Sequence, residues 1–152
     1  MGGVSGKAKE GLTLLGRSES RLPGSPDEAH LETFENCRVG RRYWICLEAP
    51  EFSSLCPVTG QPDSARLEIR YVPGKRCVET KSLKFYLASF RNFPAFNEEI
   101  INRILDDLVE ALDPVEVVVR GEFAPRGGVR LTCEARHPDA GFGDPGVAGS
   151  RG

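Results

Sequence analysis

The sequence predicts an α+β domain in which two helices cover one face of a four-stranded antiparallel sheet. Half-buried strands are predicted where apolar and polar residues alternate, along 66–71, 115–119 and 129–135, and a short apolar run predicts a further strand over 43–47. Apolar residues recur at helical spacing along 83–90 and 96–112. The resulting order is strand, strand, helix, helix, strand, strand, with the helices segregated on one side of the sheet.

The second helix has the clearest end signals. Asn97 is a good N-cap residue, and Glu98 and Glu99 follow it where the positive end of the helix dipole favours acidic side chains. Pro114 stops the helix. The connection 124–128 reads Ala-Pro-Arg-Gly-Gly, which is typical of a turn between two antiparallel strands.

Length and composition indicate one soluble globular domain. The chain has 152 residues, of which 39% are hydrophobic and 28% charged. A net charge of -2 gives no general attraction to nucleic acid or membranes, and no apolar run approaches the roughly 20 residues of a membrane span. Without a signal peptide, a cytoplasmic protein is expected. Glycine is concentrated at both ends, which predicts flexible tails over 1–29 and 138–152 around a domain at 30–137.

The five cysteines are scattered and include no CxxC pair, so neither a disulfide framework nor a metal site is expected. Cys46 and Cys133 lie in apolar segments and are predicted to be core residues. Cys56 differs, because it lies in a proline- and glycine-containing loop over 52–63 that also carries Asp63. Reactive groups are often placed on stiff loops of this kind.

A thiol with a nearby carboxyl group suits attack on an electrophile such as a nitrile. Thiolate addition to the nitrile carbon leaves a negative nitrogen, which a carboxylic acid can protonate. A cysteine–histidine dyad is less well supported, because His30 and His137 lie at the two edges of the predicted domain. Lys81 and Lys84 are three residues apart on a predicted helix and could face the phosphates of a dinucleotide, although no GxGxxG motif is present.

Two motifs carry a resemblance to a known family. The segments LCPVTGQPD (55–63) and ETKSLKFY (79–86), with SFRN (89–92) and PRGG (125–128), resemble the short NADPH-dependent 7-cyano-7-deazaguanine reductases of queuosine biosynthesis. The resemblance covers roughly residues 40–136. It implies the tunnelling fold, whose ββααββ subunits form a multimeric barrel with binding pockets at the seams. It also implies NADPH as cofactor, a small deazapurine substrate and a homo-oligomer, with no direct contact to nucleic acid or membrane.

The resemblance also implies roles for individual residues. Cys56 would form a covalent thioimide with the substrate nitrile, and Asp63 would be the general acid. The base would be bound by Val78, Glu79, Thr80, Asn97 and Glu98, and NADPH by Lys81, Lys84 and Arg126. The family usually has histidine where this chain has Phe93 and Asn97.

Two other functions remain open at this point. The amidinotransferase branch of the same fold attacks the same kind of nitrile but adds nitrogen; it lacks the lysine motif, so Lys81 and Lys84 favour reduction. A non-catalytic scaffold that binds a nucleobase or a protein is the alternative from another class, with the absent histidines marking lost activity.

Overall fold

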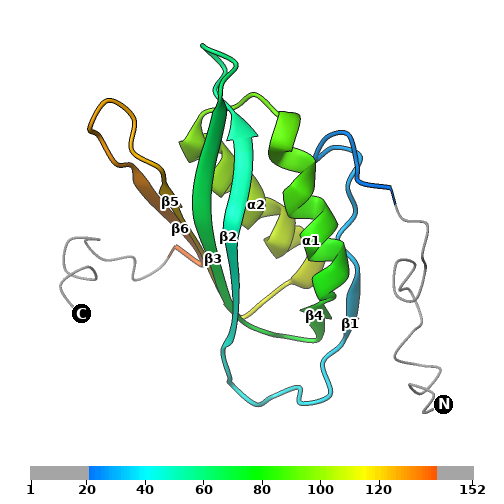
Figure 1. Ribbon diagram of the computed structural model, residues 1–152. Coiled ribbons are helices and arrows are strands. Elements are labelled where there is room, and N and C mark those ends of the chain that lie inside the picture. Colours follow the sequence, from blue (N-terminus) through cyan, green and yellow to red (C-terminus); the bar gives the residue numbers. More distant parts are fainter. Residues whose placement is uncertain (1–20, 140–152) are drawn as a thin grey trace.

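The protein is described here by a computed structural model covering residues 21–139. Its main sheet has four antiparallel strands in the order β2 (Ile45–Leu55), β3 (Pro62–Val72), β5 (Glu116–Phe123) and β6 (Thr132–His137). Helices α1 (Thr80–Ala88) and α2 (Asn97–Leu112) pack against one face of this sheet (Figure 1). The predicted fold class and element order are confirmed. Most of the predicted tails, 1–20 and 140–152, lies outside the described residues.

The core lies between the sheet and the two helices. Leu67, Ile69 and Tyr71 project from the central strand β3 and are at most 1% exposed. They meet the apolar stripe of α2, whose buried members are Ile100, Ile101, Ile104, Leu105, Leu108 and Leu112. Gly121 permits this close approach, because a Cβ atom there would lie 2.6 Å from Cδ1 of Ile101.

The N-terminus of α2 differs from the prediction. Phe96, expected to belong to the buried stripe, is the N-cap residue and is 57% exposed, and Asn97 is the first residue of the helix. The C-terminus agrees with the prediction, since the helix ends at Leu112 and is followed by Asp113 in a left-handed conformation (φ 45°). The residue before a proline is disfavoured in the α region, which explains why the helix cannot continue.

Three short elements were not predicted. Strands β1 (Thr33–Glu35) and β4 (Arg76–Val78) form a separate two-stranded sheet, and the 3-10 helix η2 (Ser89–Asn92) follows α1 directly. Segments of three or four residues are too short for the spacing of their apolar residues to distinguish a strand from a helix. Two residues of the predicted N-terminal tail contact the helical layer: Arg103 binds Asp27 at 2.7 Å, and Arg91 donates to the carbonyl of Pro23 at 2.8 Å.

Strand β2 is longer than predicted, and the loop that follows it is shorter. Phe52–Leu55 belongs to β2 and Pro62 and Asp63 belong to β3, so the connection covers only residues 56–61. The register between the strands shifts at residues 50–51, and this irregularity interrupts the alternation that the sequence analysis relied on. Cys46 is exposed, so the prediction of a core position was wrong for it, while Cys133 is half-buried.

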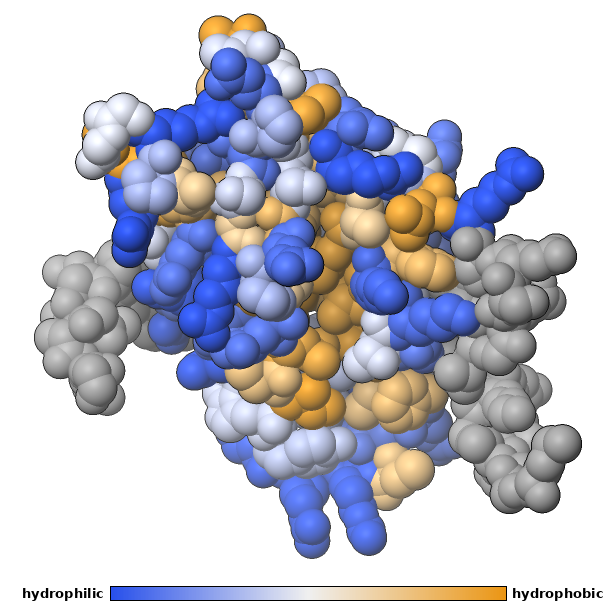
Figure 2. Space-filling model, viewed as in Figure 1, coloured by the Kyte–Doolittle hydropathy of each residue, from blue (hydrophilic) through white to orange (hydrophobic). Residues whose placement is uncertain are grey.

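The sheet face opposite the helices is charged. The described ion pairs on it join arginines to glutamates: Arg42–Glu116, Arg66–Glu48, Arg70–Glu68, Arg120–Glu122, Arg120–Glu134 and Arg136–Glu134. A different surface lies between β2 and α1, where Figure 2 shows hydrophobic residues in a hollow bordered by hydrophilic ones. Neither helix of the described chain combines the length and apolar character that crossing a membrane requires.

Candidate active site

Cys56 lies at the tip of the β2–β3 hairpin, directly after the last residue of β2. Its N–H donates to the carbonyl oxygen of Gln61 at 2.9 Å and closes the loop. Hydrogen bonds from the Thr59 hydroxyl, from the N–H groups of Thr59 and Val58 and from Arg126 lower the pKa of the Cys56 thiol to about 7, against a small opposing effect of desolvation. A thiol with this pKa is substantially ionised at neutral pH, and the thiolate is the nucleophilic form.

Asp63 is the second residue of β3, on the other arm of the hairpin that carries Cys56. It pairs in register with Ser54 of β2, and its side chain is 11% exposed. Arg126, from the connection between β5 and β6, places Nη2 2.6 Å from Oδ1 of Asp63 and also donates to the carbonyl of Pro62 at 3.1 Å. The two hairpins therefore bring Cys56, Asp63 and Arg126 together.

The start of α2 lies next to the same hairpin. The N–H of Leu55 donates to the carbonyl of Phe93, and the N–H of Ala95 donates to the carbonyl of Leu55, both at 3.2 Å. The side-chain oxygen of Asn97 is buried and has no hydrogen-bond partner among the described residues. A buried acceptor without a donor is unusual and suits a donor from a bound molecule.

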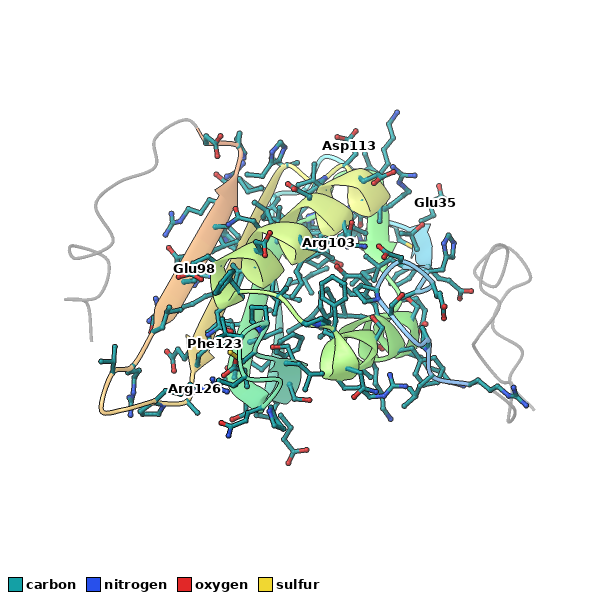
Figure 3. The ribbon with its side chains drawn as sticks, turned by 90° about the horizontal axis from the view of Figure 1, so that it is seen from above. Glu35, Glu98, Arg103, Asp113, Phe123 and Arg126 are labelled. Carbon is teal, nitrogen blue, oxygen red and sulfur yellow. The ribbon has the colours of Figure 1, made fainter. Side chains whose placement is uncertain are left out.

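Glu98, the next residue, is exposed on α2. Figure 3 shows Glu98 and Arg126 on the same side of the molecule, near Phe123. Burial, and then the negative charge of Glu98, raise the pKa of the Cys133 thiol on β6. Glu98 therefore faces the outer strand of the sheet at the end where the hairpin tip lies.

A second group of predicted residues lies where β4 meets α1. Val78, Glu79 and Thr80 line a pocket of about 340 Å³. Glu79 is 6% exposed and is the N-cap of α1, where its two carboxylate oxygens accept from the N–H groups of Lys81 at 2.7 Å and Ser82 at 2.8 Å. Its carboxylate thus has a structural role that the sequence analysis did not predict.

The two predicted lysines lie further along α1. Lys84 is exposed and, with Arg91, lines the groove of about 580 Å³ between α1 and β2. The Nζ atom of Lys81 lies 6.0 Å from the ring centre of Phe85. Arg126 is not brought together with these lysines, because it lies at the hairpin tip beside Asp63.

The two groups lie at opposite ends of the molecule (Figure 1). Leu47 borders the pocket of Val78 and Glu79, whereas Leu55 directly precedes Cys56. These two residues are eight positions apart along β2, which corresponds to roughly 25 Å at about 3.3 Å per residue. A molecule the size of a nucleobase cannot contact both groups of one chain.

Neither His30 nor His137 lies at the hairpin that carries Cys56. His30 borders a pocket between the N-terminal segment and the helices, and His137 pairs with Val117 at the far end of β6 from the hairpin. Within residues 21–139 no group of three or more histidine, cysteine, aspartate or glutamate side chains is arranged to hold a metal ion. Two residues near Cys56 were missed by the sequence analysis, Thr59 and the fully buried Ser54, and only the Cys-x-x-Thr spacing could have indicated the first.

The α+β subunit thus places a thiol with a lowered pKa, a carboxylate and a guanidinium at one end of the sheet. The family model described as QueF-like protein matches residues 62–141. The chain belongs to this family, and the tunnelling fold is thereby confirmed.

Curated relatives agree with this assignment. A protein of Anaeromyxobacter sp. (strain K) is 53% identical over 116 residues, which cover 76% of this chain and 94% of the relative. A Bacteroides fragilis protein is 46% identical over 140 residues (91% and 88%), and one from Neisseria meningitidis serogroup C is 44% identical over 138 residues (91% and 85%). All three are named NADPH-dependent 7-cyano-7-deazaguanine reductase.

Among solved structures, the apo form of the archaeosine synthase QueF-Like is similar. It shares 22% sequence identity, with a TM-score of 0.58 over 61% of this chain and 91% of that chain. At this identity the similarity demonstrates the common fold.

Proposed function

We propose that this protein is an NADPH-dependent reductase that converts the nitrile of 7-cyano-7-deazaguanine into an aminomethyl group, in the cytoplasmic pathway to queuosine. The observation that supports it best is the Cys56 thiol, whose pKa is lowered to about 7 beside Asp63, in a chain 44–53% identical to relatives named for this reaction. Residues 30–137 would form the catalytic domain.

In the proposed reaction Cys56 acts first. Its thiolate adds to the nitrile carbon, so a C–S bond forms while one π bond of the nitrile breaks and its electron pair moves to nitrogen. Asp63 delivers the proton that this nitrogen takes up, and the product is a thioimide on Cys56. Before this step Arg126 must release the Asp63 carboxylate that it holds in the free chain, so that Asp63 can take up from solvent the proton that it delivers.

The groove beside α1 fits the cofactor. Lys84 and Arg91 place two cations beside a mainly apolar hollow, a combination suited to phosphates next to a ring. Lys81 lies one turn earlier on the same helix and would contact the same phosphates. When bound, NADPH would supply hydride to the former nitrile carbon. Two hydrides are needed to reach the aminomethyl group, and the C–S bond breaks between them as Cys56 leaves as a thiolate. Arg126 would contact the cofactor only after leaving Asp63.

A homo-oligomer is proposed because the substrate-binding residues are divided. Val78, Glu79 and Thr80 of one subunit would meet Asn97, Glu98 and the hairpin tip of another. Strands β2 and β6 form the edges of the four-stranded sheet, and exposed edges favour pairing with another chain. Glu98 would accept hydrogen bonds from the N–H edge of the base, and Asn97 would offer its unpaired oxygen.

One assay tests the reaction. The protein is mixed with 7-cyano-7-deazaguanine and NADPH, and the absorbance of the reduced cofactor is followed while the product is identified by mass. Reduction predicts loss of NADPH absorbance and formation of the amine. Formation of an amidine from an added nitrogen donor, with NADPH unchanged, would identify the amidinotransferase function instead. Binding of the base with no turnover would identify a scaffold.

A further inference from the structure

Ser54 is buried at the hairpin end of the sheet, and its hydroxyl group has no partner there. The residue is 0% exposed, and its Oγ atom has no hydrogen-bond partner among the described residues. In that part of the chain only one other buried side-chain nitrogen or oxygen atom lacks a partner, Oδ1 of Asn97. Both lie at the same end, since the backbone of Leu55 is hydrogen-bonded to Phe93 and Ala95. Burial of an unpaired hydroxyl group opposes folding, so its presence in a native core calls for an explanation.

The residue directly opposite Ser54 in the hairpin is Asp63. The two are partners in the register of β2 and β3, so their side chains project from the same face of the strand pair. This is the face that the helical layer covers, because Phe52, two residues before Ser54, places its ring centre 5.7 Å from that of Phe90. Residues in this relation have Cβ atoms about 4.5–5.5 Å apart. A serine hydroxyl group and an aspartate carboxylate can bridge that separation with one hydrogen bond.

Arg126 explains why Ser54 and Asp63 are not hydrogen-bonded in the free chain. Its guanidinium approaches Oδ1 of Asp63 to 2.6 Å from the connection between β5 and β6. A charged donor at this distance binds a carboxylate more strongly than a neutral hydroxyl group does. In the reaction proposed above Arg126 must release Asp63, whose side chain is only 11% exposed to water. Ser54 is then the polar side chain directly across the strand pair from the released carboxyl group.

We propose that Ser54 is a positioning residue for Asp63: its hydroxyl group binds the carboxyl group that Arg126 releases and holds it for proton delivery to the substrate nitrogen. The hydroxyl group donates to the ionised carboxylate and accepts from the carboxylic acid once Asp63 has taken up a proton, so Ser54 itself loses no proton. Its role in turnover rests on the function proposed above. The exchange of partners by Asp63 does not, and it can be measured without substrate or cofactor.

The exchange of partners is tested by the melting temperatures, at pH 7, of four versions of the full chain: wild type, Ser54→Ala, Arg126→Ala and the double variant. In the wild-type background Ser54→Ala should leave the melting temperature unchanged or raise it, because it removes a hydroxyl group that has no partner. In the Arg126→Ala background Asp63 can accept from Ser54, so the same substitution should lower the melting temperature by about 3 °C. Ser53→Ala is the matched control. Its side chain projects from the other face of β2, opposite Ser64, so its effect should be equal in both backgrounds.

Steady-state kinetics test the role in turnover. Ser54→Ala should reduce kcat with 7-cyano-7-deazaguanine and NADPH by about tenfold, the effect of one lost hydrogen bond to a charged group, and should leave KM within about twofold. Ser53→Ala should leave both unchanged.

Two results would overturn the proposal. One is a change of melting temperature on Ser54→Ala that is the same with and without Arg126, which would show that the hydroxyl group does not bind the released carboxyl group. The other is an unchanged kcat of Ser54→Ala in an active enzyme. Failure of the proposed function gives a different result: the wild type does not oxidise NADPH, while Ser54→Ala still lowers the melting temperature only in the absence of Arg126.

Discussion

The Nη2 atom of Arg126 lies 2.6 Å from Oδ1 of Asp63, and the same guanidinium helps to lower the pKa of the Cys56 thiol. One cation from the β5–β6 connection therefore acts on both groups that the proposed reaction uses. A positive charge between a thiolate and a carboxylate offsets the repulsion between them. Removal of the guanidinium should consequently affect the nucleophile even before any cofactor binds.

Arg126→Ala should slow attack by Cys56 at neutral pH. Arg126 lowers the pKa of Cys56, so its removal raises that pKa and reduces the thiolate present at pH 7. The thiolate fraction at pH 7 should fall by about twofold at most, because the hydrogen bonds from Thr59 and Val58 remain, and the loss should disappear above about pH 9. The rate of adduct formation with the nitrile, followed by intact mass from pH 6 to pH 9, measures this. Arg130→Ala removes the same charge from the same connection and is the matched control.

The covalent step itself can be detected without NADPH. Incubation with 7-cyano-7-deazaguanine should increase the protein mass by that of one nitrile substrate, and Cys56→Ala should abolish the increase. Cys46→Ala is the control, because Cys46 is an exposed thiol on the charged face of the sheet, away from the hairpin tip. A mass increase that persists in Cys56→Ala would rule out Cys56 as the attacking atom.

Substitutions of Asp63 and of Glu98 should have different effects on turnover and on substrate binding. Asp63→Asn keeps the shape but cannot deliver a proton, so turnover should fall by roughly 10²–10⁴-fold while substrate binding changes less. Glu98→Gln should weaken binding by about 1–3 kcal/mol, since a donor on the buried base loses its charged acceptor. Steady-state kinetics and equilibrium titration separate the two. Glu99→Gln, one residue away in the first turn of α2, should bind normally. If Glu98→Gln also binds normally, Glu98 serves only the helix terminus.

Two inactive variants should complement each other if the site is shared between subunits. Cys56→Ala damages the hairpin end, and Glu79→Gln damages the pocket at the start of α1 while keeping one oxygen acceptor for the helix cap. Subunits of the two kinds, unfolded together and refolded as a mixture, should regain part of the activity. Some subunit interfaces would then contain both an intact hairpin and an intact pocket. Full activity in a particle of 16.6 kDa, measured by light scattering at the assay concentration, would contradict the shared site.

The order of the elements could be predicted because the apolar residues of each long segment recur at the spacing of either a strand or a helix. The alternation in β3 and the stripe of α2 depend only on residues close in the sequence, and both are confirmed. The end of β2 could not be predicted in this way. Ser53 and Ser54 read as loop residues, yet Ser54 is fully buried, because the bulge at residues 50–51 changes which side chains face the core.

Relationships between distant segments were beyond the sequence. The pairing of Arg126 with Asp63 depends on the lengths of two hairpins that meet only in the folded chain. The family resemblance placed Glu79 in a binding pocket. Its role as the N-cap of α1 could be recognised only from the structure, because it depends on where the backbone of α1 begins. The division of the predicted site into two distant groups could not be inferred either. The motifs show which residues are present, but they do not show at which end of the sheet each residue lies.

The arginine–glutamate pairs on the sheet face opposite the helices have a consequence for how this surface acts at a distance. Each exposed pair contributes little to stability. Together they cancel each other's charge within a few ångströms, so the surface presents almost no long-range field to the surrounding solution. Charged small molecules approaching this face would be neither drawn to it nor repelled, and their encounter rates with it should be nearly independent of ionic strength.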